Sequence, residues 1–220
     1  MASDEGLTPD RPVTENIGIA KTVVVATNNK GKLEEIRSAL RFPGWHFVSA
    51  GELDVEWPSP DEDGETFEDN ARIKARAAVE RFGLPALADD SGLEVDALDG
   101  EPGVYSSRYA GPCATDAENN RRLLLALSET PDAERSARFR STVVFVDDDG
   151  TETVADGACE GTIGREGRGE GGFGYDPLFQ PLAAPGKTMA ELSMPEKNAI
   201  SHRGAALKAL HDKLAGLSSS

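Results

Sequence analysis

The sequence predicts an α/β fold, a mixed β-sheet flanked by helices, on three observations. Strand-like apolar runs alternate with helical spacings along the chain. Residues 22–26 form a β-branched run that suits a strand buried on both faces, as in a parallel sheet. Residues 137–146 and 151–163 predict two long strands, and the turn residues 147–150 between them are typical of an antiparallel hairpin. A sheet that holds both kinds of pairing is mixed.

The remaining elements follow in chain order. Apolar residues recur at helical spacing over 30–41, and residues 45–50 predict a second strand. Thr66 offers an N-cap for a helix that reaches Phe82, where Gly83 follows and ends it. The later elements are a core strand at 86–88, a loop at 99–112, a helix at 116–128 with a capping box of Thr115 and Glu118, and a helical region from Pro195 to about Leu214.

Charge and hydropathy exclude two classes of protein. The 220 residues carry 39 acidic against 23 basic side chains, a formal net charge of −16. This charge repels a phosphate backbone, so we expect no nucleic-acid partner. No apolar run approaches the roughly 20 residues that a membrane-spanning helix needs, so we expect no membrane partner. An anionic ligand must therefore be bound by a local basic pocket or by a metal ion.

The termini and the cysteines indicate the organisation of the chain. Residues 1–18 are polar, with two prolines and no periodicity, and are predicted to be a disordered extension. No domain linker interrupts residues 19–220, which we expect to form a single domain. Met1 to Ala20 lacks the pattern of a secretory signal, and Cys113 and Cys159 are too few for a disulfide framework. These features favour a cytoplasmic protein.

The first candidate site follows the first strand. The string Thr27-Asn28-Asn29-Lys30-Gly31-Lys32 lies where that strand ends and a helix begins. Free backbone N–H groups, the positive end of the helix dipole and two lysines make an anion site. An ordinary strand-to-helix turn explains the same residues, and the spacing is not that of a Walker A loop.

The second candidate site is Asp89-Asp90-Ser91-Gly92, directly after the apolar strand at 86–88. Consecutive strand residues point to opposite faces, so one carboxylate can face a cleft while the other braces a turn. Mg²⁺ takes one or two protein carboxylates and completes its shell with substrate phosphates. One of these acids and one from the acidic loop 51–65 would suffice, although a simple turn is the alternative.

Glycines and an aromatic residue form the third candidate site, within Gly171-Gly172-Phe173-Gly174-Tyr175-Asp176-Pro177. Glycines let the backbone approach a ligand, Phe173 offers a stacking face for a base, and Asp176 offers an acceptor for a ring N–H. Core packing by Phe173 and Tyr175 is the alternative.

The fourth candidate site is Lys197-Asn198-Ala199-Ile200-Ser201-His202-Arg203-Gly204. On an unbroken helix His202 would lie about 140° around the axis from Lys197, so the two could not face one ligand. We therefore predict a helix break between them, with a restart at Ser201. A solvated helix face is the alternative explanation for the two cations.

These four strings, in this order, resemble the family of inosine/xanthosine triphosphate pyrophosphatases, enzymes that remove deaminated purine nucleotides from the nucleotide pool. The resemblance runs from about Lys21 to Leu214. One departure is Asn28, where family members typically have glycine or serine. The resemblance implies an elongated mixed sheet in two lobes around a central nucleotide cleft, and a homodimer. It also implies hydrolysis of ITP, dITP and XTP between the α- and β-phosphates, with Mg²⁺ required and Mn²⁺ as a substitute.

The resemblance also implies roles for individual residues. Asp90 would be the catalytic base and, with Glu62, would bind the metal, although Asp61, Asp63 and Glu65 compete with Glu62 in the same loop. The substrate-binding set would be Thr27, Asn28, Asn29, Lys30, Gly31, Lys32, Ser91, Phe173, Gly174, Tyr175, Asp176, Lys197, His202 and Arg203. Two alternatives remain, a related pyrophosphatase for modified pyrimidine or methylated nucleotides, and a nucleotide-binding sensor without activity. The sensor would have no use for Glu62 and Asp90.

Overall fold

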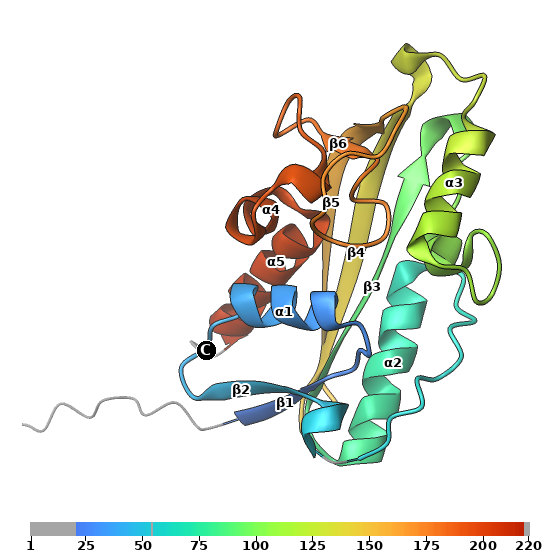
Figure 1. Cartoon of the computed structure of the whole chain (residues 1–220). Helices are drawn as coiled ribbons and strands as arrows, with labels where there is room; N and C mark the ends of the chain where they lie inside the picture. The colour runs from blue at the N-terminus through green and yellow to red at the C-terminus, as the bar shows by residue number, and fades with distance from the viewer. Residues whose placement is uncertain (1–20, 54, 218–220) are drawn as a thin grey trace, which may run out of the picture.

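The computed structural model describes residues 21–53 and 55–217 of the chain. These residues form one six-stranded sheet in the order β2-β1-β3-β4-β5-β6, with helices on both sides (Figure 1). The strands are β1 (Lys21–Val25), β2 (Trp45–Ser49), β3 (Ala86–Val95), β4 (Ser136–Val146), β5 (Glu152–Ile163) and β6 (Phe179–Pro181). The helices are α1 (Lys30–Ala39), α2 (Phe67–Phe82), α3 (Asp116–Ala126), α4 (Met194–Ile200) and α5 (His202–Leu217).

The sheet is mixed, as the sequence predicts. Strand β1 pairs in parallel with β2 and with β3, whereas β3, β4, β5 and β6 pair antiparallel. The hairpin of β4 and β5 is closed by a turn in which the N–H of Gly150 donates to the carbonyl of Asp147 at 3.0 Å. Because β4 and β5 are long, they extend through both ends of the molecule (Figure 1).

Alternate residues of the central strands pack on opposite layers. Val23, Val25 and Leu87 belong to the core beneath α1 and α5, whereas Val24 and Ala86 belong to the core beneath α2. A third apolar cluster fills the other end of the molecule, between the sheet and α3. The period of two in the strand sequences therefore divides the molecule into two helical layers.

Helix α2 packs on the sheet through alanines. Its fully buried Ala71, Ala75 and Ala78 meet Ala86 and Ala88 of β3 in one cluster. Small side chains on both surfaces bring the helix close to the strand. Both ends of α2 agree with the sequence, since Thr66 caps the N-terminus in a capping box and Gly83 ends the helix in the left-handed conformation.

The structure corrects one prediction and adds elements that the sequence did not indicate. Residues 86–95 form one continuous strand instead of the predicted strand at 86–88, so the alternative of a turn at Asp89 to Gly92 is excluded. The loop 99–112 contains a 3-10 helix at Gly103–Arg108, and β6 was not predicted. The predicted extension at 1–18 lies outside the described residues. No helix within the described ranges is long and apolar enough to span a membrane.

Helix α5 lies directly against β5 at Gly157. A Cβ atom there would be 2.1 Å from the carbonyl oxygen of His202 and 2.4 Å from the backbone nitrogen of Ala206. Both contacts are with backbone, which cannot move aside as a side chain can. The missing side chain therefore lets the first turn of α5 rest on the sheet.

We predict that Gly157→Ala lowers the free energy of unfolding by about 1–3 kcal/mol, because an extra methyl group overpacks this contact. Urea denaturation measures the change. Gly51→Ala is the control, since the nearest atom to a Cβ at Gly51 is 4.0 Å away. Equal stability of the two variants would contradict the prediction.

Candidate functional site

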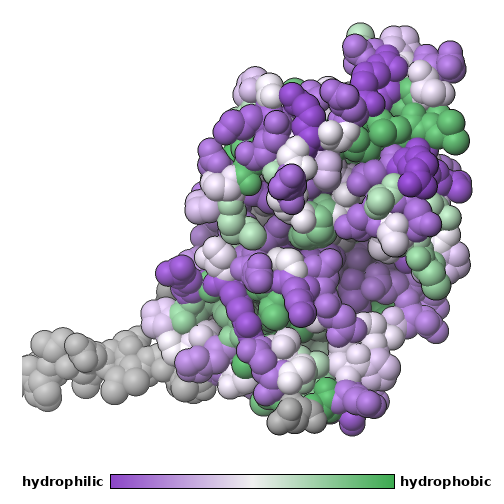
Figure 2. Space-filling model, in the orientation of Figure 1, coloured by the Kyte–Doolittle hydropathy of each residue, from purple (hydrophilic) through white to green (hydrophobic). Residues whose placement is uncertain are grey.

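A cavity of about 300 Å³ opens beside β3. Strand β1 ends at Val25, opposite Leu87, whereas β3 continues to Val95. From Ala88 to Gly92 this edge of β3 therefore pairs with no strand in the described part of the chain. Figure 2 shows the same face hollowed near its centre, with hydrophilic residues around the recess. At this open edge, side chains from both faces of β3 line the same cavity.

On the α2 side, two carboxylates converge on one lysine. Asp90 follows Ala86 and Ala88 on the same face of β3, and its Oδ1 lies 2.9 Å from Nζ of Lys74 on α2. Glu62, from the acidic loop, approaches the same Nζ at 3.4 Å. Burial raises the pKa of Asp90 even though Lys74 opposes the rise. Burial lowers the pKa of Lys74, but Asp90 and Glu62 outweigh it and the pKa is raised.

On the α1 and α5 side, Asp89 begins a chain of alternating charges. Asp89 Oδ2 lies 2.7 Å from Lys32 Nζ and 3.1 Å from Arg203 Nη2. Burial raises the pKa of Asp89, but Arg203 and Lys32 outweigh it and hold the pKa well below its ordinary value. Burial lowers the pKa of Lys32. The prediction that one acid of the pair braces a turn away from the cleft is therefore wrong, because both line the cavity.

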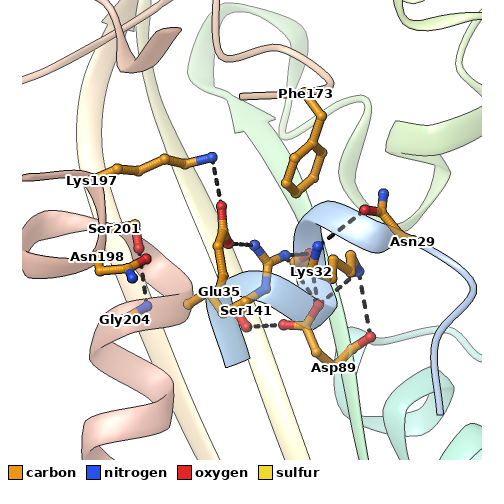
Figure 3. Close-up of polar contacts among 12 residues, drawn as sticks. Asn29, Lys32, Glu35, Asp89, Ser141, Phe173, Lys197, Asn198, Ser201 and Gly204 are labelled. Atoms are coloured by element: carbon orange, nitrogen blue, oxygen red, sulfur yellow. Dashed lines mark hydrogen bonds and ion pairs between the residues drawn. The ribbon is translucent and has the colours of Figure 1, made fainter. Parts of the chain in front are cut away.

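The chain of charges continues through Glu35, a buried residue of α1 (Figure 3). Glu35 pairs with Arg203 and, at 2.8 Å, with Nζ of Lys197, which in turn contacts Asp176 at 2.6 Å. These four side chains are at most 5% exposed. Buried charges are stable only when paired, so the chain fixes the position of each cation.

An aromatic ring covers this cluster. Phe173 lies 4.7 Å from Lys197 Nζ and 5.6 Å from the guanidinium carbon of Arg203, measured to the ring centroid. A Cβ at Gly31 would lie 2.9 Å from the Phe173 ring, so the ring packs on the α1 backbone. The N–H of Phe173 donates to Asp176 at 2.9 Å. The glycine-rich loop is thereby tied to the fourth candidate string.

The predicted helix break is confirmed. Ser201 is extended between α4 and α5, with φ −74° and ψ 155°. Its N–H donates to the carbonyl of Lys197, and its hydroxyl accepts from the N–H of Gly204 at 3.0 Å. The new axis brings Lys197 and His202 into the same cavity lining. His202 stacks on Phe139 with ring centroids 4.8 Å apart, and its buried Nδ1 has no hydrogen-bond partner among the described residues.

The structure brings most of the predicted site residues together. Those that line the cavity are Thr27, Asn28, Asn29, Lys32, Glu62, Asp90, Ser91, Phe173, Gly174, Tyr175, Asp176, Lys197, His202 and Arg203. Lys30 is exposed outside the lining, and Gly31 contributes space for Phe173. Asn29 also caps α1, because its side chain accepts from Lys32 N at 3.1 Å. Among the competing acids of the loop, Asp61, Asp63 and Glu65 are exposed.

Sequence reasoning missed several buried polar residues around the cavity, and three of them belong to or contact its charged groups. Glu35 lies on α1, and Asn70 and Lys74 lie on α2 beside its alanine stripe. A signal existed for the last two, since they are four residues apart and therefore share one face of a helix that the sequence predicts to be buried. The sequence offered no comparable signal for Glu35, whose partner Arg203 is 168 residues away.

The donor set at Asp90 fits a divalent cation held partly by substrate. The described ranges contain no group of three or more His, Cys, Asp or Glu side chains arranged for a metal. Glu62 and Asp90, however, already share one cation, the Lys74 ammonium. Two carboxylates suit Mg²⁺, which keeps waters and phosphate oxygens in its shell.

We predict that His202 makes stability depend on pH. Burial, aided by Arg203, holds the pKa of His202 well below its ordinary value. Below about pH 6.5 the imidazole of the unfolded chain is therefore protonated, whereas that of the folded protein stays neutral. The contribution of neutral His202 to the free energy of unfolding is complete above that pH and falls by up to about 1.4 kcal/mol per pH unit as the pH drops. Urea denaturation midpoints of the wild type and of His202→Gln between pH 7 and pH 5 give the slope of stability against pH for each protein. A slope that stays the same in the variant would contradict the assignment.

Comparisons with known proteins agree with this geometry. The sequence profile of the Ham1 family matches residues 23–213. A dITP/XTP pyrophosphatase of Desulforamulus reducens is 53% identical over 84% of this chain and 92% of its own length, and one of Geobacter sulfurreducens is 50% identical over 87% and 96%. The structure of a HAM1 protein from Coxiella burnetii has a TM-score of 0.78 at 46% identity, covering 89% of this chain and 99% of its own. This chain belongs to the Ham1 family.

Proposed function

We propose that this protein hydrolyses the deaminated purine nucleoside triphosphates ITP, dITP and XTP to the nucleoside monophosphate and pyrophosphate. The observation that carries the proposal is that one cavity holds two groups of residues. One group is suited to a metal ion and phosphates and is called the phosphate end, and the other is suited to a base and is called the base end. At the phosphate end Glu62 and Asp90 converge on Lys74, in a cavity that Asn29 and Lys32 at the N-terminus of α1 also line. At the base end the Phe173 ring, which also packs on Gly31 of α1, lies beside Asp176, and the backbone N–H of Phe173 donates to the Asp176 carboxylate. The names of the relatives support the same activity.

Charge in the cavity supports a requirement for Mg²⁺, with Mn²⁺ as a substitute. The described lining holds four Lys and Arg side chains and five carboxylates, and the cations are already paired. A triphosphate adds further negative charge that this lining does not neutralise. A divalent ion held by Glu62 and Asp90 would supply that neutralisation and polarise the phosphate.

The residues of the phosphate end would orient the substrate. The Lys32 ammonium and the positive end of the α1 dipole favour a phosphate there. Asp90 would accept the proton of the attacking water. The water oxygen would bond to the α-phosphorus while the bond from that phosphorus to the bridging oxygen breaks. Pyrophosphate would leave with the bridging oxygen, and the oxygen of the water would remain on the monophosphate. This chemistry needs positioned charges rather than a covalent intermediate.

The residues of the base end would select the base. Hypoxanthine and xanthine present an acceptor at position 6 and an N–H at position 1, whereas adenine presents the reverse. His202 and Asp176 both line the cavity, and the Asp176 carboxylate offers an acceptor. Arg203 is committed through both Nη atoms to Glu35, Asp89 and Ser91, so we assign it chiefly to holding the cluster. Stacking on Phe173 adds affinity with little choice between bases.

Two further properties belong to the proposal. A cytoplasmic location is supported by the free thiols of Cys113 and Cys159, since disulfides are rare in that compartment. A homodimer is supported by the resemblance to the pyrophosphatase family, and sedimentation equilibrium of the full chain distinguishes it from a monomer.

We predict that Asp90→Asn lowers kcat/KM for ITP by at least about 100-fold, because the carboxylate that binds metal and accepts the proton is lost. Steady-state kinetics at saturating Mg²⁺ measure the loss, and thermal denaturation reports the fold. Asp156→Asn is the control. Asp156 lies on β5 outside the cavity lining, where it accepts from the Thr142 hydroxyl at 2.6 Å. Near-normal turnover by Asp90→Asn would refute the assignment.

The substrate and product are tested with a panel of ITP, dITP, XTP, GTP, ATP and a methylated nucleotide in Mg²⁺. Phosphorus NMR of each completed reaction is expected to show pyrophosphate. We expect kcat/KM to fall more from ITP to ATP than from ITP to GTP, because adenine leaves buried polar groups unpaired. Release of orthophosphate would reject the pyrophosphatase, equal rates for ATP and ITP would reject the base preference, and no turnover would favour the sensor.

A further inference from the structure

One buried amide connects the two carboxylates of the phosphate end. Asn70, on α2, is fully buried and lies outside the cavity lining. Its Nδ2 donates to Asp90 Oδ2 at 3.3 Å, and its Oδ1 accepts from the backbone N–H of Gly64 at 2.9 Å. Gly64 is two residues from Glu62. The same side chain therefore contacts the strand that carries one acid and the loop that carries the other.

The direction of this amide is fixed by its partners. A backbone N–H can only donate, so the oxygen of Asn70 must face Gly64 and its NH₂ must face Asp90. Lys74, one helical turn further along α2, donates to the other oxygen of Asp90 at 2.9 Å. Each oxygen of Asp90 is thus held by a different residue of α2, which sets the rotation of the carboxylate.

The loop around Glu62 is held on two sides. A Cβ at Gly64 would lie 2.7 Å from Asn70 Oδ1 and 2.6 Å from the Asp69 Cβ, so only glycine allows this approach. The carbonyl of Glu62 accepts from Nη2 of Arg108 at 3.1 Å. Backbone contacts at Glu62 and Gly64 therefore fix the segment from which the Glu62 carboxylate projects.

We propose that Asn70, with Arg108 on the other side of the loop, is a positioning residue that sets the separation of Glu62 and Asp90 for a divalent cation. The inference rests on the proposed function, because it requires that these two acids bind the metal. Asn70 acts through Asp90 and Gly64 and contacts no substrate. Partners that orient metal ligands typically change metal affinity by about 10–100-fold when they are removed.

The experiment compares the full-length wild type with Asn70→Ala, Asn70→Leu and Arg108→Ala. Electron paramagnetic resonance measures Mn²⁺ binding without nucleotide, and ITP hydrolysis is titrated with Mg²⁺. We expect Mn²⁺ to bind about 10–100-fold more weakly to the Asn70 variants. The Mg²⁺ concentration for half-maximal rate should rise by a similar factor, with KM for ITP at saturating metal little changed. Arg108→Ala should shift metal affinity in the same direction by less.

Asn119→Ala controls for the loss of a buried amide. Asn119 lines the cavity, but its side-chain hydrogen bonds go to neither Glu62 nor Asp90. It also joins a helix to a loop, since it donates to the Ser107 carbonyl at 3.1 Å and accepts from the Ala110 N–H at 2.7 Å. We expect Asn119→Ala to lose about as much thermal stability as Asn70→Ala, without a change in Mn²⁺ affinity. This comparison separates positioning from a purely structural contribution.

The outcomes distinguish this inference from the proposed function. Mn²⁺ affinity that is unchanged in the Asn70 variants, with lowered thermal stability, would overturn the positioning role alone. A wild type that binds no Mn²⁺ and hydrolyses ITP without metal would overturn the metal-dependent function, and this inference with it. If both Asn70 variants fail to fold, Arg108→Ala decides, and an unchanged metal affinity in that variant counts against the proposal.

Discussion

The site depends on one mismatch in length, because β3 continues past the point where β1 ends. Up to Leu87 the strand is enclosed on both edges, and beyond it the edge toward β1 is open. An enclosed strand would hide its alternate side chains in two separate layers. At an open edge, Asp89 and Asp90 reach the same cavity from opposite faces. The strand order β2-β1-β3 reverses at β1, and open α/β sheets bind ligands at such a reversal, outside the carboxyl ends of the parallel strands.

The chain of paired charges explains how a protein with a net charge of −16 can hold an anion. Each cation near the cavity is kept in place by a carboxylate that is itself buried, as with Arg203 between Glu35 and Asp89. The cost of burying these groups is offset only by their mutual pairing. The cations of the described lining are therefore already compensated by carboxylates before any ligand arrives, and the divalent ion proposed above would add the positive charge that a triphosphate needs.

Local patterns in the sequence predicted most of the helices and strands. Thr66 and Thr115 mark helix starts through capping boxes, and the turn after Val146 marks the hairpin. The break at Ser201 followed from helical geometry alone. Asp89 was placed wrongly, because its environment is set by where β1 stops, which no local pattern encodes. Glu35 was missed for a related reason, since its partners come from the far end of the chain.

The alanine contact between α2 and β3 has a consequence for how this site can change. Lys74 extends from the helix and Asp90 from the strand, so the gap between the two backbones determines whether ammonium and carboxylate meet. The methyl groups of Ala71 and Ala75 act as the spacers of that gap. Larger side chains there would lift the helix and pull the charges apart without altering a single charged residue. The apolar contact between α2 and β3 thus sets the distance between the Lys74 ammonium and the Asp90 carboxylate. Substitutions of alanines that touch no ligand can therefore change the charge interactions in the site.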